Sequence, residues 1–159
     1  MERLLKEISE NKILTLSLKV YSHACVLLSV ILFVMLEYKA YESSLTEALS
    51  LAVSLAVPFL VVSVLRVIIN APRPYEVLGI YENLPKNKRG RSFPSRHAFS
   101  VFAIAVTAFP TYPALAVTGI ILGVGLCIAR VLLGIHFVRD VLAGALIGIA
   151  SAAFGLIIL

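Results

Sequence analysis

The sequence predicts an all-α protein, a polytopic membrane bundle of about five transmembrane helices with an additional interfacial helix at the N-terminus. Hydrophobic residues make up 60% of the 159 residues, charged residues only 14%, and the mean hydropathy is +0.97. In a soluble domain, roughly a quarter of all residues would be charged. The apolar residues also form long runs separated by polar segments, as expected for a chain that crosses a bilayer repeatedly. Without any repeat or linker, residues 1–159 are expected to form a single domain.

The N-terminal segment, residues 1–12, places Leu4, Leu5 and Ile8 on one side of a helix and charged residues on the other. This pattern is typical of a helix that lies in the membrane interface. A solvated terminus would carry the same charges, so both interpretations stay open.

Five apolar segments are expected to span the membrane. The polar stretch 38–47 is expected to be a loop, and Pro58 should kink the span that follows it. Pro72 and Pro74 end that span, because a proline disfavours helix for the residue before it. The third span is short, and we expect the turn at 94–97 to form its start. The expected spans are 13–36, 49–69, 98–109, 114–133 and 138–159.

Three polar clusters lie at ends of these spans that should share one membrane face. Because successive spans alternate in direction, the end of the second, the start of the third, the end of the fourth and the start of the fifth meet on that face. The clusters are Arg66 with Arg73, the segment 95–97, and the segment 130–140. We therefore expect them to converge on one pocket.

The last of these clusters has the groups of an activated histidine. His136 and Asp140 are four residues apart, so on a helix the carboxylate can accept a hydrogen bond from one imidazole nitrogen and leave the other as a lone-pair donor. Arg130 adds a permanent cation whose N–H groups match an oxyanion. Pro94 and Ser95 resemble a helix start, where free N–H groups favour an anion, with Ser95 acting as cap or as ligand.

Together these groups predict a site for a multiply charged oxyanion, of which phosphate is the simplest. A metal site is not expected, because the surrounding arginines would repel a cation, and no cofactor is expected. Each residue also has a plainer interpretation. Arginines at helix ends can anchor to lipid headgroups, Ser95 can act only as a cap, and Asp140 can pair only with Arg139. The combination favours a site.

At these residues the sequence resembles the type 2 phosphatidic acid phosphatase (PAP2) family, whose phosphate site is shared with vanadium haloperoxidases. The first family motif, a lysine, six residues and then Arg-Pro, is matched by Arg66 and Arg73-Pro74. The second, Pro-Ser-Gly-His, is matched by residues 94–97. The third, Ser-Arg, five residues, His, three residues and Asp, is matched by Ala129-Arg130, His136 and Asp140.

Three positions depart from the motifs. Arg66 replaces a lysine and keeps the cation. Arg96 replaces a glycine, which removes close backbone approach and adds a charge that could hold a second phosphate. Ala129 replaces a serine, so one hydroxyl contact is missing. The family core usually has six spans, which implies that here the first is lacking or has shrunk to the interfacial segment.

The resemblance implies one PAP2-like domain over residues 1–159, an integral membrane lipid phosphatase that needs no metal and works through a phosphohistidine. It implies that His136 attacks phosphorus, that Asp140 holds its ring, and that His97 protonates the leaving oxygen and later activates water. The implied phosphate ligands are Arg66, Arg73, Ser95 and Arg130, with Arg96 as an additional candidate. The implied substrates are phosphatidate, phosphatidylglycerophosphate, lysophosphatidate or a polyprenyl pyrophosphate, held at the lipid bilayer.

Two other classes use parts of this pattern. A haloperoxidase-like oxidant would bind vanadate in the same anion site, but five membrane spans argue against it. A non-catalytic membrane protein of the same fold would bind an anion or phospholipid at the arginines without turnover. A transporter would more often place its polar groups near the midplane of the bilayer.

The basic balance of the chain suits a membrane surface. The formal net charge is +5, which favours contact with anionic lipid and gives little reason to expect nucleic acid. The positive-inside rule predicts a cytoplasmic site, whereas comparable family members mostly work on the outer face. Apart from the implied ligands, the basic residues on the side of the site are Arg3, Lys6, Lys12, Lys19, Lys86, Lys88, Arg89, Arg91 and Arg139, against Lys39 on the other side.

Overall fold

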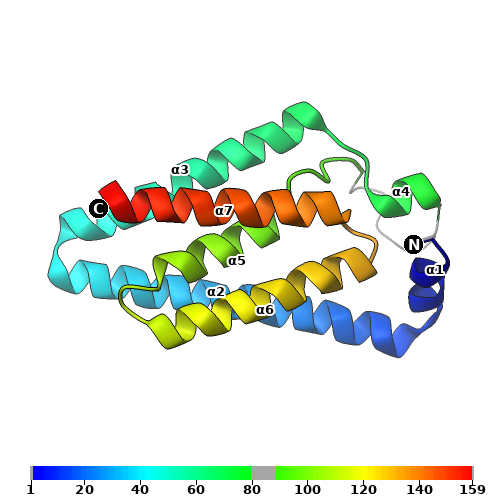
Figure 1. Cartoon of the computed structure of the whole chain (residues 1–159), viewed down its shortest axis with the longest axis horizontal. Helices are drawn as coiled ribbons and strands as arrows, with labels where there is room; N and C mark the ends of the chain where they lie inside the picture. The colour runs from blue at the N-terminus through cyan, green and yellow to red at the C-terminus, as the bar shows by residue number, and fades with distance from the viewer. Residues whose placement is uncertain (1, 80–88, 159) are drawn as a thin grey trace.

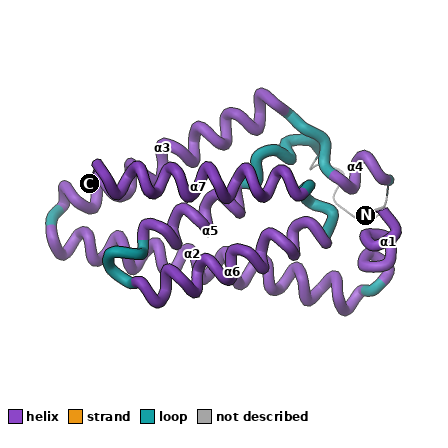
Figure 2. Tube along the Cα trace, in the orientation of Figure 1, coloured by secondary structure: helices purple, strands orange, loops and turns teal. Residues whose placement is uncertain are grey.

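The structure is a computed structural model that describes residues 2–79 and 89–158, and over these residues it is built from helices alone. The long helices run side by side along the molecule, with α1 and α4 at one end and the C-terminus at the other (Figure 1). The connecting loops gather at the two ends (Figure 2). The helices are α1 (Glu2–Glu10), α2 (Lys12–Ser43), α3 (Leu45–Ile69), α4 (Pro74–Leu78), α5 (Arg96–Thr107), α6 (Pro113–Leu132) and α7 (Val138–Ile158).

Four of these helices, α2, α3, α6 and α7, are long and apolar enough to cross a membrane. The remaining expected span is α5, whose 12 residues give about 18 Å of helix, less than the roughly 30 Å of a hydrocarbon core. Although α5 is too short to span the bilayer, it is held inside the bundle by contacts with α2, α3, α6 and α7. The expected multi-pass membrane bundle is therefore confirmed, and within the described residues it is all-helical, with a short helix at its centre.

Close packing of α5 on α7 is made possible by glycines. A Cβ atom at Gly144 would overlap the backbone oxygen of Ser95, and one at Gly148 would overlap that of Phe99. Small residues four positions apart lie on one face of a helix and allow the backbones of two helices to approach closely. The start of α5 is thereby held against the second and third turns of α7.

The expected loop at 38–47 is wrong. Helix α2 continues to Ser43 and α3 begins at Leu45, so only Ser44 separates them. Ser44 caps α3 by accepting a hydrogen bond from the Glu47 backbone N–H at 3.1 Å. The polar side chains of this stretch lie on exposed helix surface, where Lys39 and Glu42 form an i,i+3 ion pair, so polarity here does not end the helix.

The N-terminal segment is helical, as the sequence predicts, and part of its apolar side is covered. Leu5 and Ile8 are buried, whereas Leu4 is 48% exposed. Helix α1 contacts α2 and α6. It is therefore docked on the bundle at the same end as α4 (Figure 1).

Candidate functional site

A cavity of about 660 Å³ lies where the end of α3, the start of α5, the end of α6 and the turn before α7 meet. The expected convergence of the three polar clusters is therefore realised. Of the predicted site residues, Ser95 and Asp140 lie behind the cavity wall. The others line the cavity: Arg66, Arg73, Arg96, His97, Arg130 and His136.

The cavity is strongly basic. Among the described residues that line it, six are arginines and none is acidic. Arg89 and Arg91, which the sequence analysis counted only for the charge balance between the two membrane faces, contribute two of the six. The nearby carboxylate of Glu76 is already engaged, because it accepts a hydrogen bond from the Gly90 backbone N–H at 2.7 Å. Such a concentration of guanidinium groups favours a ligand with several anionic oxygens.

His136 and Asp140 form the expected buried pair, with Ser92 joining them. His136 is 2% exposed and Asp140 is 0% exposed, and His136 Nδ1 lies 3.7 Å from Asp140 Oδ2. The Ser92 hydroxyl donates to Asp140 Oδ2 at 2.5 Å and lies 3.3 Å from His136 Nδ1. With Nδ1 turned toward these partners, Nε2 is the nitrogen left for a ligand in the cavity.

The pair does not lie on one helix, contrary to the expectation from its spacing. His136 precedes α7, in a turn where the backbone N–H groups of Ile135 and His136 both donate to the Arg130 carbonyl. Gly134 allows this turn with a φ of +64°, in the left-handed region that glycine tolerates. The Phe137 backbone N–H then donates to Asp140 Oδ2 at 2.9 Å, so the carboxylate fixes the turn as well as the imidazole.

The environment of His136 favours its neutral form. Burial lowers the pKa of His136 below its usual range, and the nearby positive charges of Arg73 and Arg66 lower it further, against the opposing effect of Asp140. A group with a lowered pKa stays unprotonated at neutral pH, since even an unperturbed histidine has a pKa of about 6.5. The imidazole therefore keeps the lone pair that a nucleophile or a ligand needs.

The three arginines of the first and third clusters are held differently. Arg66 is buried and donates to the Pro94 carbonyl at 2.5 Å, so it also shapes the segment before α5. Arg73 Nε donates to the Gly90 carbonyl at 3.0 Å. Arg130 Nε is buried and has no hydrogen-bond partner among the described residues. An anion in the cavity would supply that partner.

The second cluster begins α5 as the sequence predicts, although the helix itself starts at Arg96. Ser95 is fully buried and caps the helix by accepting from the Ala98 backbone N–H at 3.4 Å. Its own N–H donates to the Asp140 carbonyl at 2.9 Å. The Arg96 guanidinium lies 5.9 Å from the ring centre of Phe59, a cation–π contact at the edge of the cavity.

The sequence did not identify two residues that shape the site, Ser92 and Gly90. Ser92 is fully buried and bonded to Asp140, 48 residues away along the chain. Gly90 has a φ of +65°, and a Cβ atom there would overlap the side-chain oxygen of Asn70. Their only sequence signal was their position in the stretch just before Pro94. Lys86 and Lys88 of the same loop lie outside the described residues.

Two known proteins resemble this chain, one in sequence and one in fold. Bacitracin transport permease protein BcrC from Bacillus licheniformis is 32% identical over 82 residues, which are 52% of this chain and 40% of that protein. The match thus spans well under half of that relative's length. The crystal structure of a transmembrane PAP2-type phosphatidylglycerolphosphate phosphatase from Bacillus subtilis has the same fold, with a TM-score of 0.69 at 23% identity over 99% of this chain and 83% of that one.

The family is shown by a further match. The sequence pattern of the PAP2 superfamily matches residues 47–159, a range that contains every residue lining the arginine-rich cavity. This chain therefore belongs to the PAP2 superfamily.

Proposed function

We propose that the protein hydrolyses a phosphomonoester or a pyrophosphate of a membrane lipid through a phosphohistidine intermediate. One observation carries this proposal: a cavity lined by six arginines also presents His136, backed by the buried Ser92 and Asp140. The arginines account for binding of phosphate, and the oriented imidazole accounts for chemistry on it.

In the first step, His136 Nε2 attacks phosphorus and the bond between phosphorus and the lipid oxygen breaks. His97, which lines the same cavity, donates a proton to that oxygen, so the lipid leaves as an alcohol or, from a pyrophosphate, as a phosphate. Asp140 stabilises the positive charge that develops on the His136 ring and holds the ring through Ser92.

In the second step, water attacks the phosphohistidine. His97 has given up its proton and now accepts one from the water, and the bond from phosphorus to His136 Nε2 breaks. Inorganic phosphate leaves and both histidines return to their starting states. Arg66, Arg73 and Arg130 stabilise the phosphoryl oxygens as charge shifts in the transition state, while Ser95 contributes by fixing the start of α5.

The substrate is proposed to be an amphiphile, because the cavity lies within a bundle of membrane-spanning helices. Phosphatidate, phosphatidylglycerophosphate, lysophosphatidate and polyprenyl pyrophosphates all combine an apolar chain with an anionic headgroup. The alternative is a non-catalytic membrane protein that binds such an anion at the arginines. Arg130 Nε has no hydrogen-bond partner among the residues that the structure describes, which fits either function, and turnover separates the two.

We expect the detergent-purified protein to release phosphate from at least one member of a panel of these lipids, in the presence of a chelator and with inhibition by vanadate. His136→Ala should lower the rate at least about a thousandfold, because it removes the attacking atom. Phosphate release and the melting temperature are measured for both proteins. Folded wild-type protein that binds the lipids without turnover would support the non-catalytic alternative, and activity lost to chelator but indifferent to vanadate would refute this mechanism.

Ser92→Ala should lower kcat about tenfold or more with little change in KM, because a hydrogen bond to a buried charge is worth about 1.5–3 kcal/mol and Ser92 touches His136 rather than the ligand. Ser22→Ala is the matched control, since Ser22 is also buried but has no hydrogen-bond partner among the described residues. A rise in KM at constant kcat would contradict the positioning role.

Arg96 is proposed to hold the second phosphate of a pyrophosphate, because it adds a charge to a cavity that already contains the three arginines needed for one phosphoryl group. Arg96→Gly should lower kcat/KM for a pyrophosphate at least about tenfold more than for the monophosphate of the same lipid. Arg96→Lys, which keeps the charge, should show a loss of kcat/KM for the pyrophosphate that is smaller than that of Arg96→Gly. An equal loss on both substrates would show that Arg96 does not select between them.

The site is proposed to face the cytoplasm, on the basis of the basic residues at its end of the bundle. Glu10 and Glu42 are both exposed and lie near opposite ends, which makes them a matched pair for labelling. In intact cells, a membrane-impermeant thiol reagent should label Glu42→Cys, and should label Glu10→Cys only after permeabilisation. The reverse pattern would place the site on the outer face.

A further inference from the structure

An apolar groove adjoins the arginine-rich cavity, and we propose that it binds the hydrocarbon chain of the lipid phosphate. Its volume is about 360 Å³, and its walls come from α2, α3 and α5. The inference rests on the proposed function, because it specifies where the chain of the substrate lies. Its apolar wall includes Val26, Val30, Phe59, Val101 and Ile104.

The groove and the cavity share two residues, Arg96 and His97. This shared boundary fixes the direction of the chain. In the proposed reaction His97 protonates the oxygen that leaves, and the chain is attached on the far side of that oxygen. A substrate whose phosphorus faces His136 and whose leaving oxygen faces His97 therefore directs its chain past His97 into the groove.

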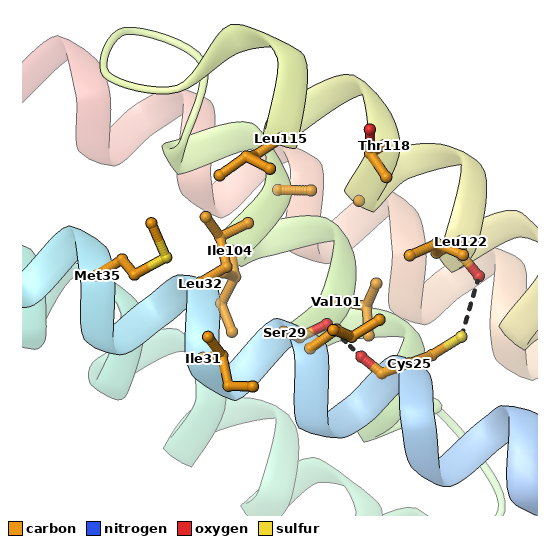
Figure 3. Close-up of a pocket in the computed structure, with 13 residues that line it drawn as sticks. Cys25, Ser29, Ile31, Leu32, Met35, Val101, Ile104, Leu115, Thr118 and Leu122 are labelled. Carbon is orange, nitrogen blue, oxygen red and sulfur yellow. Dashed lines mark hydrogen bonds between the residues drawn. The ribbon is translucent and has the colours of Figure 1, made fainter.

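Two serines, Ser100 and Ser29, also line the groove, and an apolar chain meets no unsatisfied donor from Ser29. Its hydroxyl donates to the Cys25 carbonyl of its own helix at 2.8 Å (Figure 3). Arg96 spans the boundary, with its guanidinium over the Phe59 ring on the groove side and its charge available to the cavity. The lining thus changes from basic to apolar where Arg96 and His97 separate the cavity from the groove, as an amphiphile requires.

The groove continues along α2, away from the cavity. A second hollow of about 160 Å³ shares Ser29, Val101 and Ile104 with it and extends to Leu32 and Met35 between α2, α5 and α6 (Figure 3). From Val26 to Met35 the helix rises about 14 Å, which suits a linear chain. Val30 is 49% exposed, so the groove is open toward the surrounding lipid.

A second large groove, between α3 and α7, provides the contrast. Its volume is about 550 Å³, but it shares no described residue with the arginine-rich cavity, and Glu47 lies in its wall. Ser54 in this groove matches Ser29, since both are half-buried and both donate to a carbonyl of their own helix at 2.8 Å. The same substitution can therefore be made in either groove.

The test compares Ser29→Trp with Ser54→Trp on dodecyl phosphate and on ethyl phosphate, which is too short to enter the groove. A tryptophan in the groove that binds the chain removes apolar contact with the long chain only. Ser29→Trp should therefore lower kcat/KM for dodecyl phosphate at least about tenfold, and it should change kcat/KM for ethyl phosphate less than about twofold. Ser54→Trp should change neither. Equal losses on both substrates, or a larger effect of Ser54→Trp, would overturn the proposal.

A second measurement does not depend on turnover or on a bulky substitution. The probe is a dodecyl phosphate that carries a photoreactive diazirine near the end of its chain. It is cross-linked to the His136→Ala variant, in which all groove residues are native. Label on peptides of α2 or α5 supports the groove, and label confined to residues 46–58 or 151–158 overturns it. Failure of the proposed hydrolysis would appear separately, as absence of phosphate release from both alkyl phosphates with the wild-type protein.

Discussion

The buried carboxylate of Asp140 connects three parts of the site. Its Oδ2 accepts hydrogen bonds from the Ser92 hydroxyl and the Phe137 backbone N–H, and its main-chain carbonyl accepts from the Ser95 N–H. An ionised group removed from water is costly unless it is paired and hydrogen-bonded. The bonds that make this buried charge tolerable therefore also fix the segment before α5, the turn that carries His136, and the first turn of α7. The geometry of the His136 pair and the local stability of the fold therefore have the same source.

Helix α5 carries His97 to the cavity from within the bundle, because the helix is short and packs against α2, α3, α6 and α7. Helix α5 is about 18 Å long, and it lies inside the bundle, away from the end at which α4 lies (Figure 1). Gly144 and Gly148 let its backbone approach α7 closely enough for the Ser95 to Asp140 contact. The cavity is thus recessed among apolar helices, where interactions between arginines and phosphate oxygens are less screened than they would be in water.

Some arginines of the cavity are bonded to backbone carbonyls, whereas others keep donors that a ligand could use. Arg66 and Arg73 donate hydrogen bonds to the carbonyls of Pro94 and Gly90, which holds the segment 90–94 beside the cavity. Arg130 has a buried Nε without a partner among the described residues, and Arg96 stands at the boundary with the apolar groove. The proposed amphiphilic ligand would complete both, with its phosphate at the arginines and its chain along α2.

The sequence by itself determined the membrane class, the helical segments and the convergence of Arg66, Arg73, Arg96, His97, Arg130 and His136, because apolar run length and alternating span direction are local or topological properties. It failed where polar residues were read as loop, since the cap at Ser44 and the exposed surface of α2 support helix through residue 43. It also placed His136 on a helix, although the Arg130 carbonyl and Gly134 form a turn there. Ser92, Gly90 and the apolar groove were decided only by tertiary structure, because each depends on contacts between residues far apart in the chain that no local pattern encodes.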